Sequence, residues 1–435
     1  MKLEVLKRRA LSARPLLGAT VALGAAVALN AGPALAAPAK PAPAAAAATK
    51  VVPSKGFAPT ALAAQKAIND AKANPAVAPA ARQALDAAFA AATTPDDKFI
   101  AGQFAVALGG EMKDSALQRR GLASMLESGK VPAAEAPKYN FYLGSMAYDA
   151  KDYGAARAAL QAAVQAGYHD NDADALLAEA YMQDNQTAQG LSMLQQAISQ
   201  RAAAGNPAPQ SWYRRGLGAA YKAKLLPQAA GFSIGLVKAY PTAENWAGAI
   251  TVVREVAHYP AQEELDLMRL MDRTNSYAEG RDYVEYIQSA DARRLPGEVL
   301  TVINKGIASG KITANDPFVA EARGIANGRI AADKASLPGL ERDARGASAT
   351  AATASAAGDA FLSYGDTARA IELYTLALGK PGVDRDRVLT RLGIAQVDKG
   401  DYAGAQATFA KVGGPRKPMA DLWAIYAQQK AGGHA

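Results

Sequence analysis

Apolar residues recur at steps of three and four positions along almost the whole chain after residue 56, whereas strict apolar–polar alternation is scarce. This spacing places apolar side chains on one face of an α-helix, so the pattern predicts helices and almost no strands. Short polar segments separate the helical stretches, and two of them, Gly365-Asp366 and Gly400-Asp401, lie 35 residues apart. A glycine suits the left-handed end of one helix, and an aspartate caps the start of the next. The chain therefore predicts helix–turn–helix units in tandem.

Small and large apolar residues keep the same order within these units. In one unit Leu143-Gly144 is followed by Leu160, and the same spacing makes Leu217-Gly218 and Ile234 packing positions of a later unit. Small residues allow two helices to approach closely, and the large residue fills the groove beside the next unit. The pattern predicts five clear units, at 137–170, 171–204, 211–244, 351–385 and 386–419, and three weaker ones, at 99–128, 245–280 and 283–310.

These positions resemble the tetratricopeptide repeat (TPR), which places Leu-Gly and an aromatic residue on a first helix and Ala-x₃-Phe on a second. The resemblance implies an all-α fold in which tandem helix-turn-helix units stack into a right-handed α-solenoid. One departure concerns the tryptophan expected four residues into each repeat. Asn140, Asp174 and Arg214 stand at that position in the first three clear units.

The N-terminus is typical of an export signal. A basic start precedes the apolar run 16–29, and Ala34-Leu35-Ala36 supplies the small residues that a signal peptidase needs. We expect cleavage after Ala36 and a periplasmic protein without a membrane span, with secretion or an uncleaved anchor as alternatives. The predicted organisation is a signal peptide at 1–36, an Ala/Pro-rich linker at 37–56, a helical array at 57–330, a junction at 331–350 and C-terminal repeats at 351–430.

Net charge gives little support for nucleic-acid binding. The first 36 residues carry five positive side chains and one negative, so the remaining chain has a net charge of +4 rather than +8. This mild excess does not indicate a nucleic-acid partner.

Candidate catalytic chemistry is sparse. The stretch 231–235 matches G-x-S-x-G, which in hydrolases presents a nucleophilic serine after a buried strand. No such strand precedes Ser233, so a packing role in a helix is the favoured interpretation and a Ser233 hydrolase the alternative. The chain has no cysteine and three histidines without metal-ligand spacing. We therefore predict no enzyme activity, metal, cofactor or small-molecule substrate.

In the family that the chain resembles, first-helix side chains line a groove that binds peptides or partner helices. By position, the resemblance implies a groove of aromatic, basic and acidic side chains, formed by Lys138, Phe141, Tyr148, Glu179, Trp212, Arg215 and Lys222. We expect a non-enzymatic interaction scaffold of the bacterial cell envelope, with another envelope protein or a peptide as partner. The alternative within this class is a component of an envelope or exopolysaccharide export assembly.

Overall fold

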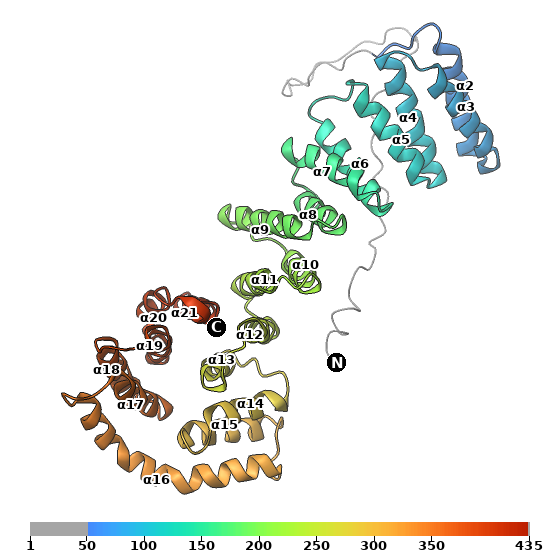
Figure 1. The fold of residues 1–435 in the computed structure, drawn as a ribbon. Helices are drawn as coiled ribbons and strands as arrows, with labels where there is room; N and C mark the ends of the chain where they lie inside the picture. Colours follow the sequence, from blue (N-terminus) through green and yellow to red (C-terminus); the bar gives the residue numbers. More distant parts are fainter. Residues whose placement is uncertain (1–50, 434–435) are drawn as a thin grey trace, which may run out of the picture. The chain divides into compact units, whose positions relative to one another are not determined.

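The computed structural model describes residues 51–433, which form helices and connecting turns without a strand (Figure 1). The predicted signal peptide and most of the predicted linker lie outside these residues. Seven helix pairs follow one another: α2 (Ala58–Ala73) and α3 (Ala78–Ala91), α4 (Pro95–Met112) and α5 (Ser115–Glu127), α6 (Ala136–Asp149) and α7 (Tyr153–Gln165), α8 (Ala173–Gln183) and α9 (Thr187–Ala203), α10 (Gln210–Lys222) and α11 (Leu226–Ala239), α12 (Ala243–Ala257) and α13 (Ala261–Arg273), α14 (Gly280–Ala290) and α15 (Pro296–Ala308).

The C-terminal part begins with one long helix. It comprises α16 (Pro317–Arg345), the pairs α17 (Ala351–Ser363) and α18 (Thr367–Leu378), α19 (Arg385–Lys399) and α20 (Tyr402–Phe409), and the last helix α21 (Lys417–Ala431). Short 3-10 turns lie at η1 (Pro75–Val77) and η2 (Gly414–Arg416). Each of the clear and weaker predicted units corresponds to one helix pair, so the prediction of an all-α, TPR-like helical repeat is confirmed.

The predicted punctuation explains where the helix pairs turn. Gly365 and Gly400 adopt positive φ angles of 76° and 86°, which glycine reaches without steric cost. Asp366 and Asp401 then cap α18 and α20, because their side chains accept hydrogen bonds from the backbone N–H groups of Arg369 and Gly404.

Buried residues are organised differently in the two halves of the chain. Up to α11, buried apolar residues form local clusters that each involve neighbouring helices. From Val237 to Ala427 most of them belong to a single cluster. The N-terminal repeats are therefore coupled to their neighbours, whereas the helices after α11 share one core.

The helix α16 connects two parts of this shared core. Residues 331–345, which the sequence predicted to be a junction, continue this helix up to Arg345. Its buried residues are Val319, Ala322 and Ala326 near one end and Ala344 near the other. Between these ends only partly buried contacts are made, such as that of Leu337 with the core, and the helix contains Pro338, which has no N–H to donate.

The last helices contact the middle of the chain. Helix α21 contacts α11, α12 and α13, and α19 also contacts α13. The Trp246 ring of α12 lies edge-on to the Tyr426 ring of α21, with 6.2 Å between centroids. We call these contacts of α19, η2 and α21 with α11–α13 the closure interface.

Candidate functional site

Close glycine contacts define the register of four helix pairs. A methyl group added to Gly216 would lie 2.4 Å from the Phe232 ring, whereas one added to Gly218 would meet nothing within 4 Å. The glycine and its large partner are 16 residues apart here and in the other pairs, which are Gly144 with Leu160, Gly358 with Tyr374, and Gly393 with Phe409. The packing pair of the third clear unit is therefore Gly216 and Phe232, not Gly218 and Ile234.

This register moves the third unit two residues earlier and changes the position of Trp212. It becomes the fourth residue of its repeat, where the TPR pattern expects a tryptophan. Trp212 is fully buried, and its indole N–H has no hydrogen-bond partner among the described residues. Its predicted place on a groove surface is corrected, because a buried ring cannot contact a partner directly.

Phe141 is also buried. Its ring packs against those of Tyr142 and Tyr168, at centroid distances of 5.6 and 5.1 Å. It therefore supports the surface from beneath and does not line it.

Three of the expected groove residues come together. Arg215 Nη1 of α10 lies 3.0 Å from Glu179 Oε2 of α8, and both side chains are partly exposed. Burial, and then the neighbouring Glu179 carboxylate, raises the pKa of Tyr148 on α6, which keeps its hydroxyl protonated. Tyr148, Glu179 and Arg215 therefore form one contiguous set across three successive first helices, which we call the polar row.

The remaining expected groove residues, Lys138 and Lys222, are exposed. Neither makes an ion pair or hydrogen bond with another residue in the range 51–433. Another contact between first helices is absent from the sequence-based prediction: the Tyr221 hydroxyl of α10 donates to Glu255 Oε2 of α12 at 2.8 Å.

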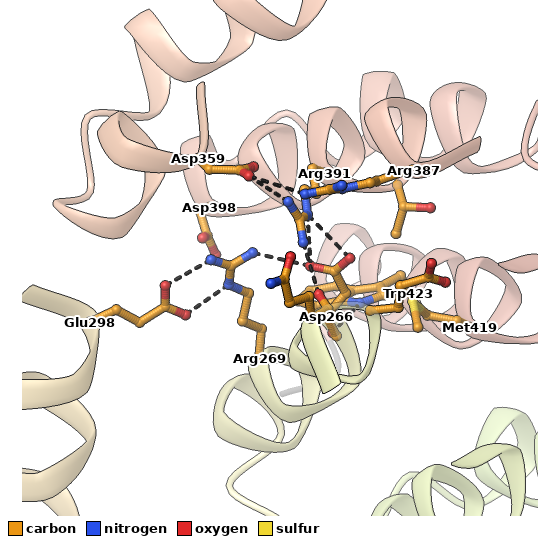
Figure 2. Close-up of polar contacts among 12 residues, drawn as sticks. Asp266, Arg269, Glu298, Asp359, Arg387, Arg391, Asp398, Met419 and Trp423 are labelled. Carbon is orange, nitrogen blue, oxygen red and sulfur yellow. Dashed lines mark hydrogen bonds and ion pairs between the residues drawn. The ribbon is translucent and has the colours of Figure 1, made fainter. Parts of the chain in front are cut away.

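A second polar cluster lies within the closure interface and is built on Asp266 of α13 (Figure 2). Its carboxylate contacts Arg269 Nη1 at 3.1 Å, Arg391 Nε at 3.3 Å and Arg416 Nη1 at 3.1 Å. Asp266 is fully buried, and the three arginines are at most 4% exposed. Although burial opposes ionisation, these guanidinium groups lower the pKa of Asp266.

The other acids of this cluster also have cationic partners. Glu298 accepts from Arg269 Nε and Nη2, each at 2.7 Å, and from the Tyr286 hydroxyl at 2.8 Å. Asp359 of α17 pairs with Arg391 (Figure 2). Because each of these carboxylates is held by arginine in a buried setting, the cluster is suited to joining helices and not to acid–base chemistry.

The candidate nucleophile Ser233 lies inside α11. It is 2% exposed, and its hydroxyl donates to the Ala230 carbonyl of the same helix at 2.9 Å. This supports the packing interpretation, since a nucleophile elbow requires a strand-to-helix turn. The part of the chain that the structure describes also contains no group of three or more acidic or histidine side chains placed to hold a metal ion.

No family model and no curated protein matches the chain, whereas solved structures of other helical proteins do. It is similar to a chain in the structure of Naa15/Naa10 bound to HypK-THB, with 14% identity, a TM-score of 0.25, and coverage of 86% of this chain and 68% of that one. A chain of the APC/C hetero-tetramer Cut9-Hcn1 has 13% identity and a TM-score of 0.20, and the match covers 87% of this chain and 84% of that one. A chain of the human IFIT1 dimer with PPP-AAAA has 14% identity and a TM-score of 0.21, and the match covers 81% of this chain and 77% of that one. These scores carry no functional argument, so the repeat fold rests on the chain's own helix pairs.

Proposed function

We propose that this chain is a non-enzymatic protein-interaction scaffold of the bacterial cell envelope. In this proposal a segment of a partner protein binds across α6, α8 and α10. The observation that carries the proposal is the polar row, in which three successive repeats each contribute one side chain to a common surface. Tyrosine and arginine are favoured anchors at protein interfaces because they combine apolar area with directional hydrogen bonds.

The envelope location is part of the proposal and rests on the signal-like sequence 1–36. In residues 51–433, no helix combines the length and apolarity required to cross a bilayer. The chemistry of these helices suggests a partner segment that carries hydrogen-bonding or acidic groups, because Lys138 of α6 and Lys222 of α10 are exposed.

Two neighbouring arginines give a matched test. Arg215 pairs with Glu179 within the polar row, whereas Arg214 is more exposed and pairs with Glu244 at 3.3 Å. We expect Arg215→Glu to weaken partner binding at least tenfold, because it replaces an anchor with a charge that Glu179 repels. Arg214→Glu should change binding by less than about threefold.

The partner would first be captured from an envelope extract with the wild-type chain and identified by mass spectrometry. Affinities of the purified pair would then be measured by calorimetry for the wild type and both variants. Equal affinities for the two variants, with both still folded by circular dichroism, would remove the polar row from the proposed interface.

A further inference from the structure

The closure interface joins segments that are far apart in the sequence. Arg273 of α13 and Asp398 of α19 form a bidentate ion pair, with N–O distances of 2.8 and 2.9 Å. Two aromatic side chains of α21 add hydrogen bonds: Trp423 Nε1 donates to the Asp266 carbonyl at 2.9 Å, and the Tyr426 hydroxyl donates to the Arg273 carbonyl at 3.2 Å. The C-terminal helices are thus held to the middle of the chain by non-covalent contacts with strict geometric requirements.

The C-terminal helices α17–α21 have their own internal packing. Each helix of this series contacts the next, and Phe409 of α20 stacks on Trp423 of α21 with 6.2 Å between centroids. The Tyr374 hydroxyl of α18 donates to Asp359 of α17 at 2.7 Å. These contacts lie within α17–α21 and would hold the five helices together on separation from α11–α13, so we call them the C-terminal unit. Tyr364 at the end of α17 also packs against Gly297 of α15, which adds one contact outside the closure interface.

Helix α16 is the covalent link between the C-terminal unit and the preceding repeats. No residue between Ala326 and Ala344 is buried in this helix, and Pro338 interrupts its hydrogen bonding. Additional methyl groups at Gly324 and Gly328 would meet nothing within 4 Å. The Tyr364 hydroxyl donates to Asp333 at 2.7 Å and Leu337 packs against the core, so α16 from Asp333 onward belongs with the C-terminal unit. Residues 327–332 are the part of α16 without a packed or paired side chain, and glycine has a low helix propensity, so a bend near Gly328 is the least costly way to separate the two parts.

We propose that the C-terminal unit exchanges between two copies of this chain, so that the α19–α21 face of one copy occupies the α11–α13 face of the other. The partner that fits this surface is a second copy, because every contact of the closure interface re-forms unchanged in such a dimer. Exchange of an identical element is a low-cost route to dimers, since only the hinge differs from the monomer. The monomer dominates when the protein is dilute, because the tether gives the intramolecular contact a high effective concentration.

Charge reversal across Arg273 and Asp398 tests the exchange directly. Arg273→Asp alone places two acids opposite each other, and Asp398→Arg alone places two arginines opposite each other. When the two variants are combined, a swapped heterodimer has the native Arg273 and Asp398 pair at one interface and a reversed but complementary pair at the other. Neither variant gains a complementary pair as a monomer. We expect co-expression of two differently tagged variants to give a heterodimer of twice the monomer mass by light scattering, with at least tenfold more co-purification than two tagged wild-type chains.

Two further chains complete the experiment. The double variant carrying both reversals in one chain should remain monomeric, because it restores the pair within one copy. Reversal of the exposed Lys66 and Asp70 pair, split between two copies in the same way, should give no heterodimer. If the co-expressed Arg273→Asp and Asp398→Arg chains stay monomeric, or aggregate while the double variant folds, exchange of the C-terminal unit is ruled out.

Discussion

Single residues decide the register of the repeats, and the register predicted from the sequence was wrong in the third clear unit. Leu217-Gly218 imitates the Leu-Gly pair of the family pattern, yet Gly216 is the glycine against which Phe232 packs. Sequence spacing alone does not separate two glycines that are two residues apart, because both fit a helix. Trp212 could have given the correct register, because the family pattern expects a tryptophan at the fourth position of the repeat.

The two glycines should respond to alanine in opposite directions. Gly216→Ala places a methyl group against the Phe232 ring, and such overpacking costs about 1–3 kcal/mol. Gly218→Ala adds a methyl group in open space and improves helix propensity by up to about 1 kcal/mol. Hydrogen exchange of the α10 and α11 amides in the full chain measures both effects. Greater destabilisation by Gly218→Ala would contradict the pairing of Gly216 with Phe232.

At the scale of elements, helix boundaries and pairing were largely predictable, because caps and apolar periodicity are local signals. Residues 331–345 are an exception: their small and polar composition indicated a junction, although they continue α16. The start of the described chain also differs from a free linker. The Ser54 N–H and hydroxyl donate to Asp97 of α4 at 2.8 and 2.9 Å, which fixes this segment to the helix start.

The anchoring of this segment should depend on pH through Asp97. Although burial opposes ionisation, hydrogen bonds from Ser54 and Thr94 lower the pKa of Asp97 to about 2 from 3.8. A lowered pKa in the folded state means stabilisation that is complete above about pH 4 and lost as the pH falls through about 2, worth about 2 kcal/mol. Asp97→Asn should therefore increase hydrogen exchange in α2 and α4 at neutral pH, and the difference from the wild type should shrink near pH 2.

Asp70→Asn provides the control, because Asp70 and its partner Lys66 are both exposed and solvent screens such a pair. A difference between Asp97→Asn and the wild type that stays constant from pH 7 to pH 2 would show that the charge of Asp97 does not hold this segment.

At the scale of the whole molecule, sequence reasoning predicted neither the closure interface nor its charge cluster. Asp266 lies 125 residues from Arg391 and 150 from Arg416, so no local pattern relates them. The polar row was partly predictable, because Tyr148 and Glu179 follow from their positions within a repeat, whereas Arg215 was assigned from a register that the structure corrects. The closure interface instead depends on the tertiary arrangement that brings α19 and α21 into contact with α13.

Removing the shared acid of this cluster should destabilise the C-terminal half selectively. Asp266→Asn leaves three buried arginines without their common counter-charge, and breaking a buried ion pair in this way costs about 3–5 kcal/mol. Asp421→Asn, on the exposed Lys417 pair, should cost less than about 1 kcal/mol. Urea unfolding of the full chain measures the free energy that each variant loses, and hydrogen exchange shows which helices lose protection. Equal loss of protection in α4–α9 and α13–α21 would argue against a separate C-terminal core.

The contrast between the local clusters up to α11 and the core that the later helices share has a mechanical consequence. Under tension applied at its two ends, the chain should lengthen first through the N-terminal helix pairs, which yield one after another at low force because each is coupled only to its neighbours. The later helices should resist as a block and then give way in one large step. Such a protein would extend at low force through its N-terminal repeats, whereas its C-terminal helices would unfold together at a higher force.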